Sequence, residues 1–309
     1  MLTRREFLQT SSISIAGAAM IGAPTLGAAQ SNEGVPMLKR VIPASGEAVP
    51  VIGMGTSGSF EIAPNSAEYQ ALKDVLKRFF AGGATLIDTA PTYSNAEDVL
   101  GSLLAEGNWR SQAFIATKLS QVQGRDAGLA QFNDTLKRLR TDKVELLQVH
   151  NLGDWQTQME VARELKRQGK TKYVGVTHFV ESAQERLADI VQQTKPEFLQ
   201  INYSITQRGA EQRVLPMAKD LGVAVLTNRN FDDGALFNRV RGVDLPGWAK
   251  EMEVTSWAQM FLKFALSHPA VTAVIPATGK PDRQSDNLRA GLGPMLTAQH
   301  KADLITLLG

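Results

Sequence analysis

Two charged residues, Asp88 and Lys118, interrupt stretches of the sequence that are otherwise apolar. They lie in LIDTA and FIATKLS, where an isolated charge in the protein interior is costly unless an opposite charge meets it. The least costly arrangement pairs the two side chains with each other. A buried ion pair of this kind can be purely structural, so its meaning depends on the residues that lie beside it.

Tyr93 follows Asp88 at a short distance and adds a phenol to this pair. The segment from Ser94 to Glu97 has the form of a capping box, which predicts that a helix begins at Ser94 and that Tyr93 lies on the loop before it. A phenol has a pKa of about 10, and a neighbouring ammonium such as that of Lys118 lowers this value. Tyr93 could then donate a proton near neutral pH.

His150 ends the apolar run VELLQVH and is the fourth residue that can take part in acid-base chemistry. A single histidine at the end of a strand is more often a packed residue than a catalyst. Here the same chain also holds a carboxylate, an ammonium and a phenol in or just after apolar runs. We therefore expect the four side chains to meet in one site that transfers protons.

A repeated pattern, in which an apolar, β-branched run precedes an amphipathic helix, must position these residues. The runs are continuously apolar rather than alternating, which indicates a parallel sheet covered on both faces. Between the runs, apolar residues recur at helical spacing, as in Leu72, Val75, Leu76 and Phe79. The eight predicted strands span residues 51–55, 84–90, 113–119, 144–150, 173–179, 198–204, 223–229 and 272–278.

Eight such units predict an α/β protein with a (β/α)8 TIM barrel, an architecture that typically needs about 250 residues. In such a barrel the carboxyl ends of the strands carry the active site, and Asp88, Lys118 and His150 belong to those ends. A short N-terminal β-hairpin is predicted before the barrel, with Ser45 and Gly46 at its turn. A doubly wound open sheet is the alternative, and it is disfavoured because no G-x-G-x-x-G follows an early strand.

Composition restricts the class of protein and of partner. The chain has 309 residues, 43% hydrophobic and 21% charged, which suits one large domain, and we assign residues 30–309 to it. The net charge is +2 with scattered basic residues, so neither nucleic acid nor a membrane surface is the expected partner. Cysteine is absent, which excludes disulfides and thiol catalysis.

The first 29 residues resemble a twin-arginine (Tat) signal peptide. Arg4 and Arg5 precede a mildly apolar run, and small residues follow it around Ala29, where cleavage is expected. This predicts a periplasmic protein that the twin-arginine translocase exports in folded form, without stable membrane insertion. A membrane anchor is the alternative, but Pro24 and several glycines interrupt a run shorter than the roughly 20 apolar residues of a spanning helix.

The strand-end residues together resemble the aldo-keto reductase superfamily. The resemblance lies in IDTAPTYSNAEDVLG, ATKLS, LLQVHN, GVTHF, FLQINYS and IPATGKPDRQSDN, and it covers nearly all of residues 48–290. It implies an oxidoreductase that reduces aldehydes and ketones to alcohols by hydride transfer from NADP(H). Tyr93 would be the general acid, Lys118 would lower its pKa, Asp88 would hold the lysine, and His150 would orient and polarise the substrate carbonyl.

The resemblance also implies a cofactor that lies across the mouth of the barrel without a Rossmann fingerprint. NADP(H) is expected rather than NAD(H), because Lys280 and Arg283 open a helix where they can meet an adenosine 2′-phosphate; the alternative is that they are solvated charges. His178 departs from the asparagine common in the family, and Asn228 and Arg229 replace an aromatic platform under the nicotinamide. The residues implied to bind the cofactor are Gly55, Thr56, Ser57, Asp88, Thr177, His178, Gln200, Asn228, Arg229, Thr278, Gly279, Lys280, Arg283, Asp286 and Asn287.

The substrate pocket is expected to be open. Phe60 and Trp155 are predicted to form its walls beside Tyr93 and His150. The C-terminal segment LTAQHKADLITLLG is predicted to be helical, without the tail that covers the pocket in longer relatives. We expect broad activity on small or hydrophobic aldehydes and ketones, from a protein for which a monomer is favoured.

Two other functions remain open at this stage. One is a non-catalytic, cofactor-binding sensor or partner protein on the same barrel. The other is a metal-dependent hydrolase that uses His150, His178 and Asp88, although the positive charge of Lys118 would repel a metal cation.

Overall fold

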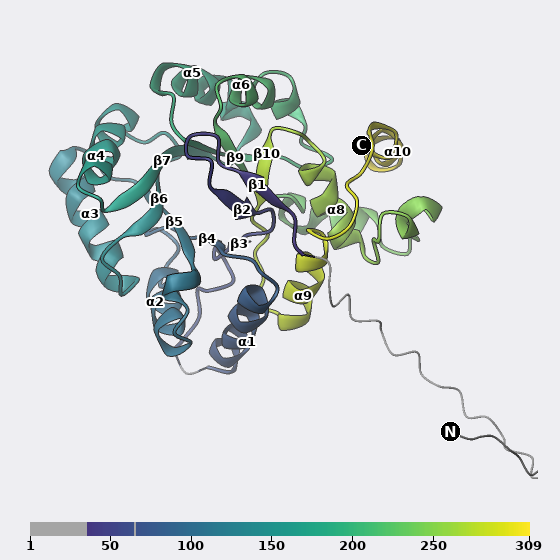
Figure 1. Cartoon of the computed structure of the whole chain (residues 1–309), viewed down its shortest axis with the longest axis horizontal. Coiled ribbons are helices and arrows are strands. Elements are labelled where there is room, and N and C mark those ends of the chain that lie inside the picture. The colour runs from purple at the N-terminus through teal and green to yellow at the C-terminus, as the bar shows by residue number, and fades with distance from the viewer. Residues whose placement is uncertain (1–35, 65) are drawn as a thin grey trace, which may run out of the picture. The chain divides into compact units, whose positions relative to one another are not determined.

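Eight parallel strands form the centre of the protein, which a computed structural model describes over residues 36–64 and 66–309 (Figure 1). The strands pair in chain order, and two isolated bridges, Ile52 to Val274 and Gly55 to Ala277, connect the last to the first. The predicted (β/α)8 barrel is confirmed. Its strands are β3 (Met54–Gly55), β4 (Leu86–Asp88), β5 (Phe114–Leu119), β6 (Val144–His150), β7 (Thr171–His178), β8 (Phe198–Asn202), β9 (Ala224–Asn228) and β10 (Val271–Val274).

The predicted hairpin precedes the barrel. Strands β1 (Lys39–Val41) and β2 (Ala48–Pro50) are antiparallel, and the turn contains Gly46 at a φ of 76°, which glycine adopts without steric cost. Ile42 and Val49 of the hairpin belong to the apolar cluster inside the barrel. The hairpin therefore covers the end of the barrel at which the strands begin.

Helices follow the strands and surround the barrel (Figure 1). The first of them buries the face predicted from the sequence, and the Ser66 hydroxyl caps it by accepting a hydrogen bond from the Tyr69 amide. The α-helices are α1 (Ala67–Ala81), α2 (Ala96–Glu106), α3 (Arg125–Arg138), α4 (Trp155–Arg167), α5 (Gln184–Thr194), α6 (Val214–Asp220), α7 (Ala235–Arg239), α8 (Trp257–Leu266), α9 (Pro281–Arg289) and α10 (Ala298–Leu308). Short 3-10 helices are η1 (Arg110–Gln112), η2 (Glu181–Ala183), η3 (Gly209–Glu211), η4 (Asp232–Gly234) and η5 (Gly247–Lys250).

The interior of the barrel changes from apolar to polar along the strands that carry the catalytic candidates. On β5, Phe114 and Ala116 belong to the inner apolar cluster, and Lys118 lies two residues further on the same face. On β6, Leu146 belongs to that cluster, and His150 lies four residues further on the same face. The chemically active side chains therefore continue the inward-facing rows, beyond the apolar layer that supports them from below.

The capping box predicted from Ser94 to Glu97 is wrong. Helix α2 begins at Ala96 after Asn95, whose side chain makes no capping hydrogen bond, and Ser94 adopts a φ of 45°. Glu97 is buried and its carboxylate accepts hydrogen bonds from Thr117, Thr135 and Arg138. Three donors from β5 and α3 satisfy the carboxylate better than one amide at the helix start, so tertiary contacts override the local motif.

The predicted export signal, residues 1–29, lies outside the described residues. The described chain belongs to one compact unit. Among the helices that it contains, none is both long and apolar enough to cross a membrane.

Candidate active site

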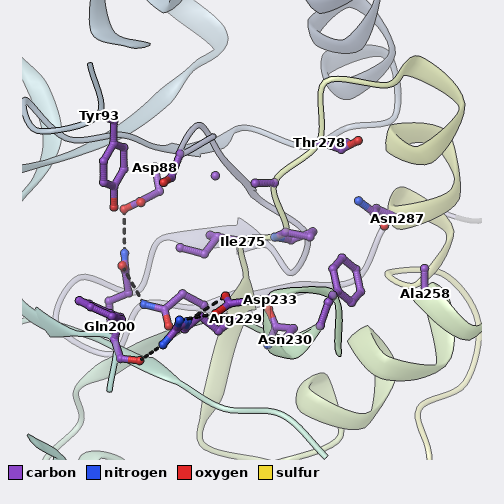
Figure 2. Close-up of a pocket in the computed structure, with 18 of the residues that line it drawn as sticks. Asp88, Tyr93, Gln200, Arg229, Asn230, Asp233, Ala258, Ile275, Thr278 and Asn287 are labelled. Atoms are coloured by element: carbon purple, nitrogen blue, oxygen red, sulfur yellow. Dashed lines mark hydrogen bonds and ion pairs between the residues drawn. The ribbon is translucent and has the colours of Figure 1, made fainter. Parts of the chain in front are cut away.

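A cavity of about 1120 Å³ opens at the carboxyl ends of the strands. Its walls come from β4, β6, β7 and β8, and from the loops that follow β3, β9 and β10. Figure 2 shows Asp88 and Tyr93 at one end of the cavity and Thr278 and Asn287 at the other. The four residues expected to do acid-base chemistry therefore lie at one end of a long site that has room for more than a small substrate.

Lys118 and Asp88 form the buried ion pair that the sequence predicts. The Lys118 Nζ donates to Asp88 Oδ2 at 2.7 Å and to the Thr89 carbonyl oxygen at 2.7 Å, and the Lys118 side chain is fully buried. Burial by itself lowers the pKa of Lys118, but the charges and hydrogen bonds of Asp88 and Tyr93 outweigh it and raise that pKa above its ordinary value. Lys118 therefore remains an ammonium inside the barrel.

Two glutamines hold the other oxygen of Asp88. Gln200 donates to Asp88 Oδ1 at 2.7 Å, and Gln148 lies at 3.4 Å from the same oxygen. The side-chain oxygen of Gln200, Oε1, in turn accepts from the Thr177 hydroxyl and from the Asn228 amide, both at 3.2 Å. The sequence predicted Gln200 as a contact of the cofactor but did not predict its bond to Asp88, and it missed Gln148 altogether.

The phenol of Tyr93 lies over this ion pair. The Lys118 Nζ is 5.0 Å from the centre of the Tyr93 ring. Burial raises the pKa of Tyr93, and the positive charge of Lys118 opposes that rise without cancelling it. The expected net lowering of this pKa is therefore wrong, because burial, which depends on the tertiary structure, outweighs the charge of Lys118. Tyr93 carries its proton at neutral pH.

His150 faces Tyr93 across the site. The two ring centres are 6.1 Å apart and the rings are nearly perpendicular, at 83°. Burial, followed by the charges of Lys118 and His178, lowers the pKa of His150 to about 3. His150 is therefore neutral at physiological pH. Its Nδ1 lies 2.5 Å from the hydroxyl oxygen of Ser120, a residue that the sequence analysis did not single out.

Most of the predicted cofactor residues line the cavity. They come from widely separated segments of the chain, which the barrel brings to one rim. Those that line it, together with the catalytic candidates Tyr93 and His150, are Gly55, Ser57, Asp88, Thr177, Gln200, Asn228, Arg229, Thr278, Arg283, Asp286 and Asn287.

Four of the predicted cofactor residues do not line the cavity. Thr56 is fully buried and donates to the Thr89 hydroxyl at 2.9 Å. His178 alternates with the inward-facing Thr177, and its ring accepts a hydrogen bond from the Val180 amide. Gly279 and Lys280 lie just before α9, outside the lining.

The two predicted pocket walls are also corrected. Phe60 has no exposed surface and belongs to the hydrophobic core between the barrel and its helices. Trp155 begins α4 and packs against the same core. Neither lines the cavity. Both are large apolar side chains, and the core offers each of them more apolar contact than the rim does.

Aromatic residues that the sequence analysis missed line the cavity instead. Phe179 follows β7, its ring stacks on that of His178, and it is 41% exposed. Phe231, Phe237 and Trp257 line the far part of the cavity. Phe231 lies in the loop after β9, Phe237 lies within the short helix α7 and Trp257 begins α8, and aromatic residues in such places look like packing residues in the sequence.

An ion pair lies at the mouth of the cavity. The Arg229 Nε donates to Asp233 Oδ1 at 2.9 Å, and its Nη1 donates to the Phe179 carbonyl oxygen at 3.3 Å. Figure 2 shows Arg229 and Asp233 joined to the right of Gln200. Arg229 and Asp233 both adopt left-handed backbone angles, with φ of 53° and 51°, and the ion pair connects them. As the sequence predicts, Asn228 and Arg229 stand in place of an aromatic platform, and Asp233 balances the charge of Arg229.

Asp286 and Arg283 are charged residues that line the far part of the cavity. Asp286 accepts from the Ser256 hydroxyl and from the Gln259 amide, both at 2.6 Å. Arg283, in the first turn of α9, forms no ion pair with any residue that the structure describes, and it is exposed. This end of the cavity can therefore accept a negatively charged group.

The described residues do not form the metal site that the alternative function, a metal-dependent hydrolase, would use. Within residues 36–64 and 66–309, no three histidine, aspartate or glutamate side chains are grouped so that they could hold a metal ion. His178 is outside the cavity lining, and the Lys118 ammonium occupies the place next to Asp88.

Comparisons with known proteins identify relatives over most of the chain. The model described as "Aldo/keto reductase family" matches residues 51–303. The chain is 28% identical over 203 residues to "Aldo-keto reductase YhdN" of Bacillus subtilis (strain 168), which covers 61% of this chain and 60% of that relative, less than two thirds of its length. It is 26% identical over 247 residues to "Glyoxal reductase" of the same organism, covering 79% and 83%. Among solved structures, an aldo-keto reductase from Klebsiella pneumoniae in complex with NADPH aligns with a TM-score of 0.76 at 25% identity, over 88% of this chain and 96% of that one.

The low pKa of His150 predicts how acid affects stability. A histidine in an unfolded chain titrates near a pKa of about 6.5, whereas His150 in the folded protein has a pKa of about 3. Below about pH 6.5 the unfolded chain therefore takes up a proton that the folded protein does not, and His150 destabilises the fold progressively as the pH falls. In His150→Gln, the free energy of unfolding relative to the wild type should rise by about 2 kcal/mol between pH 7 and pH 4.5.

Urea titrations of both proteins at the two pH values measure this change. A difference between the two proteins that is the same at both pH values would contradict the prediction.

Proposed function

The chain belongs to the aldo/keto reductase family, and on this premise we propose that it reduces aldehydes or ketones to alcohols with NADPH as the reductant. One observation carries the proposal. A phenol, a buried ammonium with its carboxylate and a neutral imidazole meet at one end of the cavity, and Arg283, which forms no ion pair with any described residue, lies at the other. This arrangement offers a proton donor beside a fixed positive charge and room for a dinucleotide, which supports reduction of a carbonyl group.

Tyr93 is proposed as the general acid. Its raised pKa keeps the proton on the phenol at neutral pH, so that the phenol can donate it to the substrate carbonyl oxygen as negative charge develops there. When the proton leaves, the phenolate is stabilised by the Lys118 ammonium, 5.0 Å from the ring centre. Asp88 keeps that ammonium in place, so the stabilising charge is present before the reaction begins.

His150 is proposed to orient the carbonyl rather than to protonate it. With a pKa of about 3, its ring holds only one proton at neutral pH, so it can donate a hydrogen bond but is a poor acid. A hydrogen bond from His150 to the carbonyl oxygen polarises the carbon–oxygen double bond and places that oxygen near the Tyr93 hydroxyl. The protonated phenol of Tyr93 can give up its proton, whereas the neutral imidazole of His150 is suited only to donate a hydrogen bond. We therefore propose Tyr93 as the acid and His150 as the orienting residue.

The residues along the cavity suit a dinucleotide. When bound, NADPH supplies the hydride that goes to the carbonyl carbon. Ser57, Thr177 and Asn228 offer polar groups near the catalytic end. At the other end, Arg283 and the start of α9 suit a phosphate, since exposed amides at a helix start attract anions. Of the two carboxylates in this part, Asp233 is paired with Arg229, and Asp286 accepts hydrogen bonds from the neutral side chains of Ser256 and Gln259.

The substrate is proposed to be a small or hydrophobic aldehyde or ketone. The exposed ring of Phe179 lies in the lining near the catalytic end and offers an apolar surface. The relative named glyoxal reductase supports small carbonyl compounds as the first to test. Activity is proposed to be broad, and high selectivity for one sugar or steroid would contradict this part of the proposal.

The first 29 residues support a proposal about location, on sequence alone. Arg4 and Arg5 followed by a mildly apolar run suit export of the folded protein to the periplasm by the twin-arginine translocase.

Replacing Tyr93 with phenylalanine tests the general acid. Because the variant keeps the ring and loses only the proton donor, kcat/KM for an aromatic aldehyde with NADPH should fall by about 10²–10⁴-fold. Binding of NADPH, followed by fluorescence, should be unchanged. Tyr69→Phe is the matched control, since its hydroxyl bonds Glu106 outside the cavity and its loss should leave the rate as in the wild type.

Equal rates for Tyr93→Phe and the wild type would remove Tyr93 as the acid. A wild-type protein that binds NADPH but reduces no carbonyl compound would instead favour the cofactor-binding sensor.

Replacing Arg283 with alanine tests recognition of the 2′-phosphate. A charge-assisted hydrogen bond contributes about 1.5–3 kcal/mol, so the Kd for NADPH should rise by about 10-fold or more, while the Kd for NADH changes little. Arg289→Ala, on the same helix and also exposed, should leave both constants unchanged. Fluorescence titration with each cofactor measures the effect, and an equal loss of affinity for the two would argue against a contact with the 2′-phosphate.

Replacing both Arg4 and Arg5 with lysine tests export. The translocase reads the arginine pair as an address, so the variant should remain in the cytoplasm while the wild type reaches the periplasm. Fractionation of producing cells, with the activity assay on each fraction, measures the distribution. An identical distribution of both proteins would contradict the proposed route.

A further inference from the structure

The side chain of Ser120 meets the catalytic histidine at a position set by the barrel. In the pairing of β5 with β6, Lys118 lies opposite Gln148 and Leu119 opposite Val149, so the next residue, Ser120, comes beside His150. The Ser120 hydroxyl oxygen is 2.5 Å from His150 Nδ1, and Ser120 is only 1% exposed. Strand alternation places Ser120 on the same face as Lys118, two residues earlier.

The protons around this contact can be counted. His150 is neutral, because burial and then the charges of Lys118 and His178 lower its pKa, so only one ring nitrogen carries a proton. If that nitrogen were Nδ1, it would donate to the Ser120 oxygen. The hydroxyl proton of Ser120 would then have no acceptor among the described residues. Among the residues that the structure describes, His150 Nδ1 is the only hydrogen-bond partner of the Ser120 hydroxyl. The arrangement in which Ser120 donates to Nδ1 satisfies both groups and leaves the ring proton on Nε2.

The backbone of Ser120 is held from the outside of the barrel. Gln131 on α3 accepts from the Ser120 amide at 2.8 Å and donates to the Ser120 carbonyl oxygen at 2.8 Å. These two bonds replace the strand pairing that ends at Leu119. The hydroxyl is therefore positioned before any ligand enters the cavity.

We propose that Ser120 is a positioning residue that holds His150 as the tautomer with its proton on Nε2. Nε2 is the nitrogen opposite the serine contact, and it has no hydrogen-bond partner among the described residues. His150 can then donate from Nε2 to a substrate carbonyl oxygen beside Tyr93, whose ring centre is 6.1 Å away. The role in carbonyl reduction rests on the proposed function of the site, whereas the tautomer itself does not.

The tautomer of the wild-type protein is the first test. The full chain has four histidines, so nitrogen-15 NMR of the ring nitrogens gives a small set of signals, and His150→Gln identifies those of His150. We expect a protonated, pyrrole-type Nε2 and an unprotonated, pyridine-type Nδ1 at pH 7. The reverse tautomer, or equal amounts of both, would overturn the proposal. This measurement needs neither substrate nor a folded Ser120 variant.

Substitutions of Ser120 are the second test. In Ser120→Ala, the preference for the Nε2 tautomer should be lost and kcat should fall by about 10-fold, with a smaller change in KM, because the hydrogen bond from His150 strengthens as charge develops on the carbonyl oxygen. Ser120→Thr keeps the hydroxyl and should restore both the tautomer and most of kcat. Ser204→Ala is the matched control, since it removes an equally buried hydroxyl after β8 that bonds Thr206 and Gln207 outside the cavity lining.

The outcomes separate the two proposals. An active enzyme in which Ser120→Ala changes neither the tautomer nor kcat would overturn the role of Ser120. If the wild type reduces no carbonyl compound while Ser120→Ala changes the tautomer, the assignment of the tautomer stands and the proposed function fails.

Discussion

The ion pair between Lys118 and Asp88 is the interaction on which the rest of the site depends. Both charges lie inside the barrel, just above its apolar layer, and neither could remain ionised there without the other. Asp88 binds the ammonium with one oxygen and the amide of Gln200 with the other, so the carboxylate can rotate little. The ammonium in turn lies against Tyr93, which ties the proton donor to a charge that two hydrogen bonds hold in place.

The construction of the barrel explains why such a pair can exist. The strands that carry the site contribute apolar residues to the lower interior and polar residues to the upper interior, because side chains of alternate residues share a face. The hairpin adds Ile42 and Val49 to the lower layer, which excludes water from below. A water-poor floor strengthens the electrostatic interactions above it. The same burial raises the pKa of Tyr93 and lowers that of His150, so one feature of the fold prepares both groups.

Strand register then distributes the supporting contacts. Because β5 and β6 are neighbours, Lys118 lies next to Gln148, and Ser120 lies next to His150. Lys118 and His150 thus each have a neutral hydrogen-bonding residue two positions away in the chain, Ser120 and Gln148 respectively. The outward-facing Thr117 on the same strand bonds the buried Glu97 of α2, which anchors the helix that follows Tyr93. Strand β5 therefore carries Lys118 of the ion pair on its inner face. On its outer face it carries Thr117, which holds the helix that follows Tyr93.

The sequence by itself determined the eight strands, the hairpin and the identity of Asp88, Tyr93, Lys118 and His150, because hydrophobic periodicity and charges within apolar runs are local properties of the chain. It did not determine which partner a polar group meets. Glu97 looked like a capping residue and is a buried ion-pair partner, and Phe60 looked like a pocket wall and is core. The contacts of Gln148 and of Ser120 depend on strand register. Only the tertiary structure decides these contacts and the balance between burial and charge that sets a pKa, since both depend on segments that are far apart in the chain.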